Sequence, residues 1–349
     1  MTVANSLRYS VTDYCAKIGL DSMLVQGAGG NVSWKDGDTL WIKASGTWLA
    51  DAKVKDIFVP VDLDDLRQAI ANKNFHTIPK VIGDSRLRPS IETLLHALMP
   101  QKIVIHLHAV EILAHLVRAD PAAEFKRLVG DTIKWRCIAY YKPGAELAVA
   151  VAESLLQQPD VDVLFLRNHG LVIGGTSVAD IDITLQMLLT QLKNMIDPLP
   201  LDENATESVP LLQYQDYDLC SDQELNQLAT NNYLSSRLKS EWALYPDHVV
   251  FLGSQAVILG RSINLEDLDA IHNRPAFVFD VGTGVYESKT ATTAQKAQLR
   301  CYYDVLIRQP VTEKLLTLSP SSIAELLNWD AEKYRKIQSG NETFNVADV

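Results

Sequence analysis

Two apolar segments that end in histidine constrain the fold of this chain more than any other feature. Residues 102–105 lead into the pair His106 and His108, and a second apolar run, residues 163–167, leads into His169. Side chains on an extended strand alternate between its two faces, so residues two apart point the same way and two imidazoles can bind one cation. We therefore predict a metal site at the ends of two strands.

Three imidazoles with one open coordination position are typical of a catalytic zinc, because the open position lets the metal polarise a substrate oxygen. The pair His106 and His108 is a weak indication by itself, since two hydrogen-bonded histidines at a sheet edge have the same spacing. His169 strengthens it. Gly170 would free the backbone to turn directly after this ligand, at a strand end where the active sites of α/β sheets tend to open.

A glutamate lies upstream of the histidine pair, in a segment that has the signs of a helix start. Ser90 could cap this helix, with Pro89 fixing the approach, and Glu92 would then lie in the first turn. The ordinary interpretation of such a glutamate is helix capping and complementation of the helix dipole. The alternative is a carboxylate beside the metal that acts as general base for a C–H proton. His96 shares a helical face with Glu92 and is predicted to support or pack against it.

Length and charge limit the class of protein. The chain has 349 residues, enough for two domains at about 100–200 residues each. Its 43 acidic and 32 basic residues give a net charge of −11, which opposes nonspecific binding to nucleic acid or anionic lipid and favours a small-molecule partner.

The cysteines and the hydropathy of the chain indicate the cellular compartment in which the protein is expected. The four cysteines are scattered, which indicates neither a disulfide framework nor a thiolate zinc site. There is no signal-peptide pattern at the N-terminus and no apolar run of about 18 residues. We expect a cytoplasmic, reduced protein that does not contact the membrane.

Helix-type and strand-type periodicities alternate through the first two hundred residues, which predicts an α/β fold with a sheet covered by helices. A hairpin is expected around the turn Asp36-Gly37. The expected helices span residues 3–19, 62–72, 91–98, 109–118, 145–157 and 178–196. The expected strands span residues 32–34, 39–42, 57–59, 103–106, 163–167 and 171–173.

A proline-containing stretch without periodicity follows and divides the chain. We predict a catalytic domain over residues 1–197, a linker over 198–212 and a smaller α/β domain of unknown role over 213–349. In the smaller domain we expect helices and strands, and the tail from Ser339 onward is predicted to be frayed. The expected helices there span 222–237 and 291–307, and the expected strands span 249–252 and 276–279.

The glycine cluster of residues 27–30 is not a dinucleotide fingerprint, because Val32 stands where a glycine is required and a hairpin follows instead of a helix. Its backbone amides, with Asn31 and the loop of residues 43–47, could form an anion-binding concavity. Two tight turns are the plain alternative.

The order of these motifs resembles the class II aldolase/adducin family, which includes fuculose- and rhamnulose-phosphate aldolases. The resemblance covers residues 7–196. The chain is similar in detail to the aldolase half of fused rhamnulose-phosphate aldolase/short-chain dehydrogenase proteins, which also carry a segment similar to residues 213–310. The matching segments are residues 30–33, 42–47, 89–92, 106–108, 140–147 and 168–170.

The resemblance implies a three-layer α/β/α class II aldolase-like domain, usually in a homotetramer with active sites at subunit interfaces. Glu92 would be the acid/base and would also contact the metal when no substrate is bound. Tyr140 aligns with a tyrosine that helps to protonate the aldehyde oxygen. The zinc ligands would be His106, His108 and His169. The residues facing the substrate's phosphate would be Asn31, Ser45, Gly46 and Ser90.

The expected function is that of a zinc-dependent aldolase that cleaves or forms a carbon–carbon bond in a sugar-derived ketose, as a ketose phosphate, through a metal-stabilised enediolate. Ile91 stands where the phosphate-binding aldolases have a second serine, so the phosphorylation of the substrate stays open, although Lys43 could supply charge. Glutamate at position 92 favours an aldolase over the family's epimerases, which carry aspartate there.

Other functions stay open at this point. A dehydratase or epimerase would use the same metal site and Glu92. An adducin-like interaction module would keep the fold without catalysis, and the retention of three histidines with Glu92 speaks against it. A Schiff-base aldolase would use Lys43 as its nucleophile.

Overall fold

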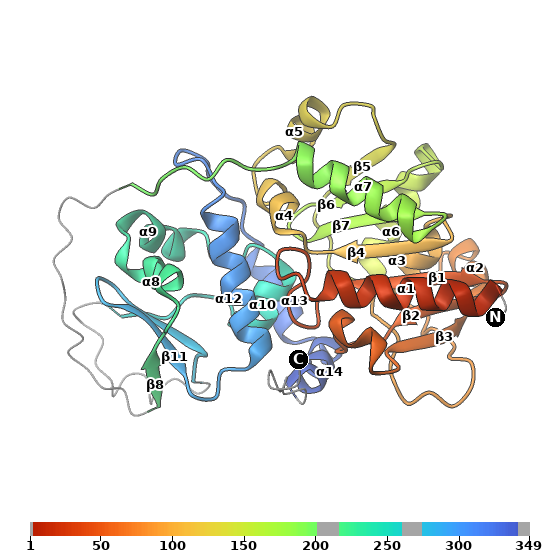
Figure 1. The fold of residues 1–349 in the computed structure, drawn as a ribbon, viewed down its shortest axis with the longest axis horizontal. Helices are drawn as coiled ribbons and strands as arrows, with labels where there is room; N and C mark the ends of the chain where they lie inside the picture. Colours follow the sequence, from red (N-terminus) through yellow and green to blue (C-terminus); the bar gives the residue numbers. More distant parts are fainter. Residues whose placement is uncertain (1–2, 201–215, 260–273, 341–349) are drawn as a thin grey trace.

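The structure is a computed structural model that describes residues 3–200, 216–259 and 274–340. Two sheets and the helices around them make up these residues, and Figure 1 shows the larger sheet beside the smaller one. We call residues 3–200 the first unit and residues 216–259 and 274–340 the second unit. The fold class predicted from sequence is confirmed.

The first unit is built on a seven-stranded sheet with the order β3-β2-β1-β4-β7-β6-β5. Its neighbouring strands pair antiparallel except for β5 and β6, which are parallel. The predicted hairpin is present, and Gly37 in its turn has a φ of 56°, which an L side chain rarely adopts. The strands are β1 (Asn31–Asp36), β2 (Thr39–Lys43), β3 (Phe58–Asp62), β4 (Ile103–Leu107), β5 (Trp135–Ile138), β6 (Val163–Leu166) and β7 (Gly170–Gly175).

Helices cover both faces of this sheet and confirm the three-layer arrangement. The predicted helices are all present, although the helix expected over 178–196 ends at Gln191, and a short helix, α5, and strand β5 were not predicted. The helices are α1 (Val3–Gly19), α2 (Leu63–Ala71), α3 (Thr93–Leu98), α4 (Val110–Leu116), α5 (Pro121–Leu128), α6 (Ala145–Gln157) and α7 (Val178–Gln191), with a 3-10 turn over Leu49–Lys53.

Successive side chains of β4 point alternately to the two faces of the sheet, and each face packs against its own layer of helices. Ile103, Ile105 and Leu107 point into the large core formed with α1, α4 and α7, whereas Val104 packs in a smaller core under α3 and α6. His106 has the same parity as Val104 and therefore points to the α3 side of the sheet. The strand thus directs its histidine toward the helix that begins after Glu92.

The second unit has a four-stranded sheet with the order β8-β11-β10-β9, and helices lie between this sheet and the first unit (Figure 1). Its last helix, α14, returns to the first unit. The strands are β8 (Tyr217–Leu219), β9 (Ile258–Leu259), β10 (Phe277–Asp280) and β11 (Gly284–Ser288). The helices are α8 (Gln223–Thr230), α9 (Asn232–Ser240), α10 (Pro246–Leu252), α12 (Thr293–Leu306), α13 (Pro320–Leu327) and α14 (Asp330–Gly340).

Two predictions for the second unit were wrong. The apolar run 249–252, expected as a strand, belongs to α10, which begins at Pro246. A short apolar run fits a buried helix as well as a buried strand, and proline favours the first helical turn. The helix expected over 222–237 is broken at Asn231, whose side chain accepts a hydrogen bond from Leu234 N and starts α9.

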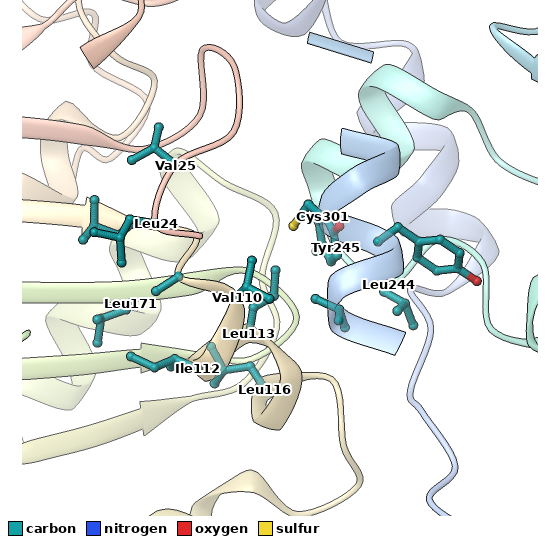
Figure 2. Close-up of a cluster of buried hydrophobic side chains, with 14 of the residues drawn as sticks. Leu24, Val25, Val110, Ile112, Leu113, Leu116, Leu171, Leu244, Tyr245 and Cys301 are labelled. Atoms are coloured by element: carbon teal, nitrogen blue, oxygen red, sulfur yellow. The ribbon is translucent and has the colours of Figure 1, made fainter. Parts of the chain in front are cut away.

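One continuous hydrophobic core joins the two units. Figure 2 shows Val110 and Leu113 of α4 opposite Leu244, Tyr245 and Cys301 of the second unit, and all belong to the same buried cluster. The predicted boundaries at residues 197 and 213 stay predictions. Most of the predicted linker, and the predicted frayed tail beyond Gly340, lie outside the described residues. Within the described parts, no helix is long and apolar enough to cross a membrane.

Truncating a side chain in this shared core should destabilise the whole described molecule. Leu244 is completely buried, so Leu244→Ala is expected to lower the free energy of unfolding by about 2–5 kcal/mol, in one cooperative transition. Leu156 is 83% exposed, and Leu156→Ala should change it by less than about 0.5 kcal/mol. Urea denaturation followed by circular dichroism measures both, and separate transitions for the two units would contradict a shared core.

Candidate metal centre

The structure brings the three predicted histidines together in a buried cluster. His106 lies in β4, His108 follows the strand, and His169 ends the turn between β6 and β7. Their candidate ligand nitrogens all lie within 4.8 Å of one another, and Nε2 of His106 is 3.1 Å from Nε2 of His108. Two nitrogens bound tetrahedrally to zinc at about 2.1 Å would lie about 3.4 Å apart. The spacing therefore fits a single metal ion.

The histidines also have the protonation state that a metal ligand needs. Nδ1 of His106 lies 3.1 Å from the carbonyl oxygen of Leu171, which can only accept, so Nδ1 carries the proton and Nε2 presents its lone pair to the cluster. Burial lowers the pKa of His106 and lowers that of His169 to about 3. Both rings are neutral at neutral pH, as metal binding requires.

The turn that carries His169 differs from its prediction. Asn168 has a φ of 50° and makes the turn, whereas Gly170 does not have a positive φ. Glycine is needed at 170 for a different reason. A Cβ there would lie 2.5 Å from the carbonyl oxygen of Leu107 and 3.0 Å from ring carbons of both His106 and His108. Gly170 therefore lets the two strand ends approach closely enough for the histidines to meet.

Adding one methyl group at this position should disrupt the cluster. Gly170→Ala is expected to weaken metal binding strongly, because the new Cβ displaces both imidazoles. Gly37→Ala is a suitable control, since Gly37 has a positive φ but nothing within 4 Å of an added Cβ. The control should lose about 1–2 kcal/mol of stability and keep its metal. Calorimetric titration with Zn²⁺ tests both, and equal affinities would contradict the steric account.

Glu92 lies beside the cluster and does not cap its helix. It is the residue before α3, and its side chain makes no capping hydrogen bond. Its Oε2 lies 3.5 Å from Nε2 of His106, and its Oε1 lies 3.5 Å from Nε2 of His169. The amide of Asn31 donates to Oε2 at 2.8 Å. The geometry favours the carboxylate beside a metal over the capping interpretation.

Glu92 is ionised despite its burial. Burial raises the pKa of this carboxyl group, but the imidazoles of His106 and His169 and the amide of Asn31 outweigh it and lower the pKa to about 2. The 2.8 Å hydrogen bond that Asn31 donates also favours the charged form of this carboxyl group. A buried carboxylate of this kind can accept a proton from a bound molecule.

A chain of polar contacts holds Asn31 in place. Its Oδ1 contacts Nε2 of His96, and Nδ1 of His96 lies 2.7 Å from Oγ of Ser33. His96 is completely buried on α3, and burial lowers its pKa to about 3. His96 therefore supports Glu92 through Asn31, as its position one helical turn after Glu92 predicted.

A cavity opens beside the cluster, and most of the predicted site residues line it. The two loops that carry the predicted phosphate-binding residues are joined by backbone hydrogen bonds from Ser45 N to Arg88 O at 2.9 Å and from Ser90 N to Lys43 O at 3.1 Å. Ile91 lines the cavity as well. The predicted residues in its lining are Asn31, Ser45, Gly46, Ser90, Glu92, His108 and His169.

Tyr140 is not brought to this cavity. Its hydroxyl group is buried without a hydrogen-bond partner among the described residues. Burial and the charges of Glu146 and Glu325 raise its pKa. Tyr140 is therefore not among the residues that line the cavity, and its assigned role stays a prediction.

Four residues of the second unit line the cavity and were not predicted. Asp247 and Pro246 begin α10, and Glu332 and Arg335 lie on α14. No local pattern marks them, because the segment of Asp247 was expected to lead into a strand and the segment of Arg335 had no assignment. They reach the site only through the packing of one unit on the other.

A comparison with protein families identifies the first unit. The model described as "Class II Aldolase and Adducin N-terminal domain" matches residues 10–194. The chain belongs to the class II aldolase and adducin family. The resemblance inferred from the sequence motifs is thereby confirmed, and class II aldolases are metal-dependent enzymes, which agrees with a buried cluster of three histidines that can hold a metal.

The comparisons also found individual proteins to which this chain is similar. An L-fuculose phosphate aldolase of Methanocaldococcus jannaschii is 30% identical over 51% of this chain and 90% of its own length. An uncharacterized oxidoreductase, YuxG, of Bacillus subtilis is 30% identical over 45% of this chain, and the match covers only 25% of that protein. The N-terminal class II aldolase domain of a Thermoplasma acidophilum protein superposes with a TM-score of 0.45 at 26% identity, covering 52% of this chain and 90% of that domain.

Proposed function

We propose that this protein is a zinc-dependent aldolase that cleaves or forms a carbon–carbon bond in a sugar-derived ketose phosphate. The observation that carries the proposal is the buried Glu92, whose two oxygens each lie 3.5 Å from a nitrogen of a different histidine in the cluster. The relative named L-fuculose phosphate aldolase supports the substrate class.

His106, His108 and His169 would hold the metal, with Glu92 close enough to contact it. A divalent cation bound there supplies a Lewis acid that polarises a carbonyl oxygen of the substrate. Three imidazoles are a ligand set that would suit zinc and would leave one coordination position for the substrate.

Glu92 performs the proton transfer in this mechanism. In the direction of synthesis, its carboxylate takes a proton from the carbon next to the ketone. That carbon then forms a bond to the carbonyl carbon of an aldehyde, the aldehyde oxygen takes up a proton from solvent, and Glu92 releases its proton to solvent. Cleavage follows the reverse order, with Glu92 returning the proton to carbon. Asn31 keeps the carboxylate oriented, through the 2.8 Å hydrogen bond to Oε2.

The loops around Ser45 and Ser90 would receive the phosphate group. Both line the cavity together with Gly46. Asn31 was assigned to the phosphate by resemblance, but its amide already contacts both Glu92 and His96, so we assign it to positioning Glu92 instead. Ile91 stands where the phosphate-binding aldolases have a second serine, so one hydroxyl donor expected for the phosphate is missing here.

Incubation with dihydroxyacetone phosphate and a panel of aldehydes tests the proposal. An aldolase converts the pair to a longer ketose phosphate, which mass spectrometry detects. Loss of water from a sugar phosphate, or inversion at one carbon without a change in length, would identify the dehydratase or epimerase that the same residues could support. Light scattering would test the homotetramer that the family resemblance supports.

The Schiff-base alternative has little support in the structure. Lys43 is 2% exposed, and its ammonium group donates to the carbonyl oxygens of Ala28, Ala44 and Thr47. A nucleophilic lysine must instead present a deprotonated amine to the substrate. Lys43 therefore holds the loop beside Ser45 in shape.

A further inference from the structure

Asp247 reaches from the second unit to one of the metal-binding histidines. It lies in the first turn of α10, is 3% exposed, and places its Oδ2 3.3 Å from Nδ1 of His108. Nδ1 of His108 has no aligned hydrogen-bond acceptor among the described residues, and the carboxylate of Asp247 is the group that faces it. Since Nε2 of the same ring faces His106 at 3.1 Å, His108 spans the distance from Asp247 to the cluster.

Gly29 leaves the space in which this contact forms. A Cβ at position 29 would lie 3.0 Å from Oδ2 of Asp247 and 3.0 Å from Nδ1 of His108. It would also lie 2.9 Å from the carbonyl oxygen of Gln26. Any side chain here would push the carboxylate and the imidazole apart. This gives the glycine cluster, which is no dinucleotide site, a specific role.

Arg335 holds the carboxylate of Asp247 from the opposite side. Its two terminal nitrogens donate to the two oxygens of Asp247, each at 2.7 Å, and the guanidinium also lies against Phe251. Such a bidentate pair fixes the orientation of a carboxylate more firmly than a single contact. Asp247 therefore faces His108 as a preformed, immobile acceptor.

The second unit also holds the turn before His169. Nδ2 of Asn168 donates to the carbonyl oxygens of Leu244 at 2.9 Å and Leu316 at 2.7 Å. Asn168 is the residue with the positive φ that directs His169 into the cluster. Two of the three histidines thus depend on contacts from outside residues 10–194, the segment that matches the family.

We propose that Asp247 is a positioning residue for the metal, and that Arg335 and the second unit act through it. A carboxylate that accepts from Nδ1 fixes the tautomer in which Nε2 presents its lone pair, and it makes the imidazole a stronger ligand. The second unit then completes a metal centre whose ligands all come from the first unit. This inference rests on the proposed metal-dependent function.

The positioning role of Asp247 is tested by measuring the Zn²⁺ affinity of the whole chain in competition with a chromophoric chelator. Asp247→Asn is expected to weaken Zn²⁺ binding by about 10–100-fold, because the amide no longer selects the required tautomer. The control is Arg308→Gln, which removes the 2.9 Å ion pair between Arg308 of the second unit and Glu111 of the first, away from the cluster. The control should lose stability and keep its Zn²⁺ affinity.

The visible spectrum of the Co²⁺-loaded protein provides a second readout that a merely structural role would not move. Asp247→Asn is expected to shift the cobalt absorption band, and Arg308→Gln to leave it unchanged. If Asp247→Asn does not fold, Gly29→Ala makes the same test, because it separates Asp247 from His108 without removing either.

The outcomes separate this inference from the function on which it rests. Unchanged affinity and spectrum in Asp247→Asn, with tight binding by the original protein, would overturn the positioning role alone. Equal losses in Asp247→Asn and Arg308→Gln would also overturn it, since docking of the units would then be the whole effect. Failure of the original protein to bind Zn²⁺ or Co²⁺ would overturn both.

Discussion

Removal of divalent metal with a chelator is expected to abolish aldol cleavage and synthesis, and added Zn²⁺ is expected to restore them. Burial disfavours the charged forms of His106 and His169, so a bound cation would supply the positive charge at the cluster that stabilises a developing oxyanion. Loss of a single oxyanion donor typically costs about 10²–10³-fold in rate, and loss of the metal should cost more. A coupled assay for the released aldehyde, with metal content measured in parallel, checks this result.

A substitution inside the cluster should reproduce the effect of the chelator, and one at another buried histidine should not. His169→Ala is expected to lose both metal and activity. His115 is equally buried but contacts Glu124 and the carbonyl oxygen of Leu192 instead, so His115→Ala should lose stability and keep its metal. Activity that persists in chelator, with borohydride trapping at Lys43, would contradict the zinc mechanism.

Glu92→Gln should lower kcat by about 10²–10⁴-fold while one metal ion per chain stays bound. The amide has nearly the same shape as the carboxylate, but it cannot take the proton from carbon. Steady-state kinetics together with metal analysis separates loss of proton transfer from loss of metal. Exchange of the substrate C–H proton with deuterated water gives a direct measure of the missing step.

Glu146 provides a matched control for the effect of Glu92→Gln. Glu146 lies in the first turn of α6, is exposed, and is not among the residues that line the cavity, so it has the ordinary dipole-complementing role that was the alternative for Glu92. Glu146→Gln should change stability slightly and leave kcat unchanged. Similar small effects from both substitutions would show that Glu92 is only a helix-start residue.

The parts of the site that sequence reasoning recovered are those encoded by short spacing. His106 and His108 share a face because strand side chains repeat every two residues, and Glu92 and His96 share one because helix side chains recur after four. Asn31 lies opposite His106 in the pairing of β1 with β4, and this register was not predicted. The order of these motifs along the chain then indicated the class II aldolase/adducin family.

The failures have physical causes that can be named. The run 249–252 is buried from all sides, so its composition could not distinguish a strand from helix α10, and the residue beside it, Asp247, was overlooked. Tyr140 was assigned by alignment alone and is not among the residues that line the cavity, so its role stays a prediction. Gly170 was correctly singled out for the wrong reason, because the close approach of two strand ends is a tertiary feature.

The sequence by itself indicated the three histidines, the glutamate near them and the layered α/β fold, since short spacings, apolar periodicity and motif order carry these features. Only the tertiary structure decided that the second unit shares the core of the first and brings Asp247 and Arg335 to His108. Contacts of that kind arise when two separate apolar surfaces pack together, and neither surface carries a local pattern that identifies the residues of the other.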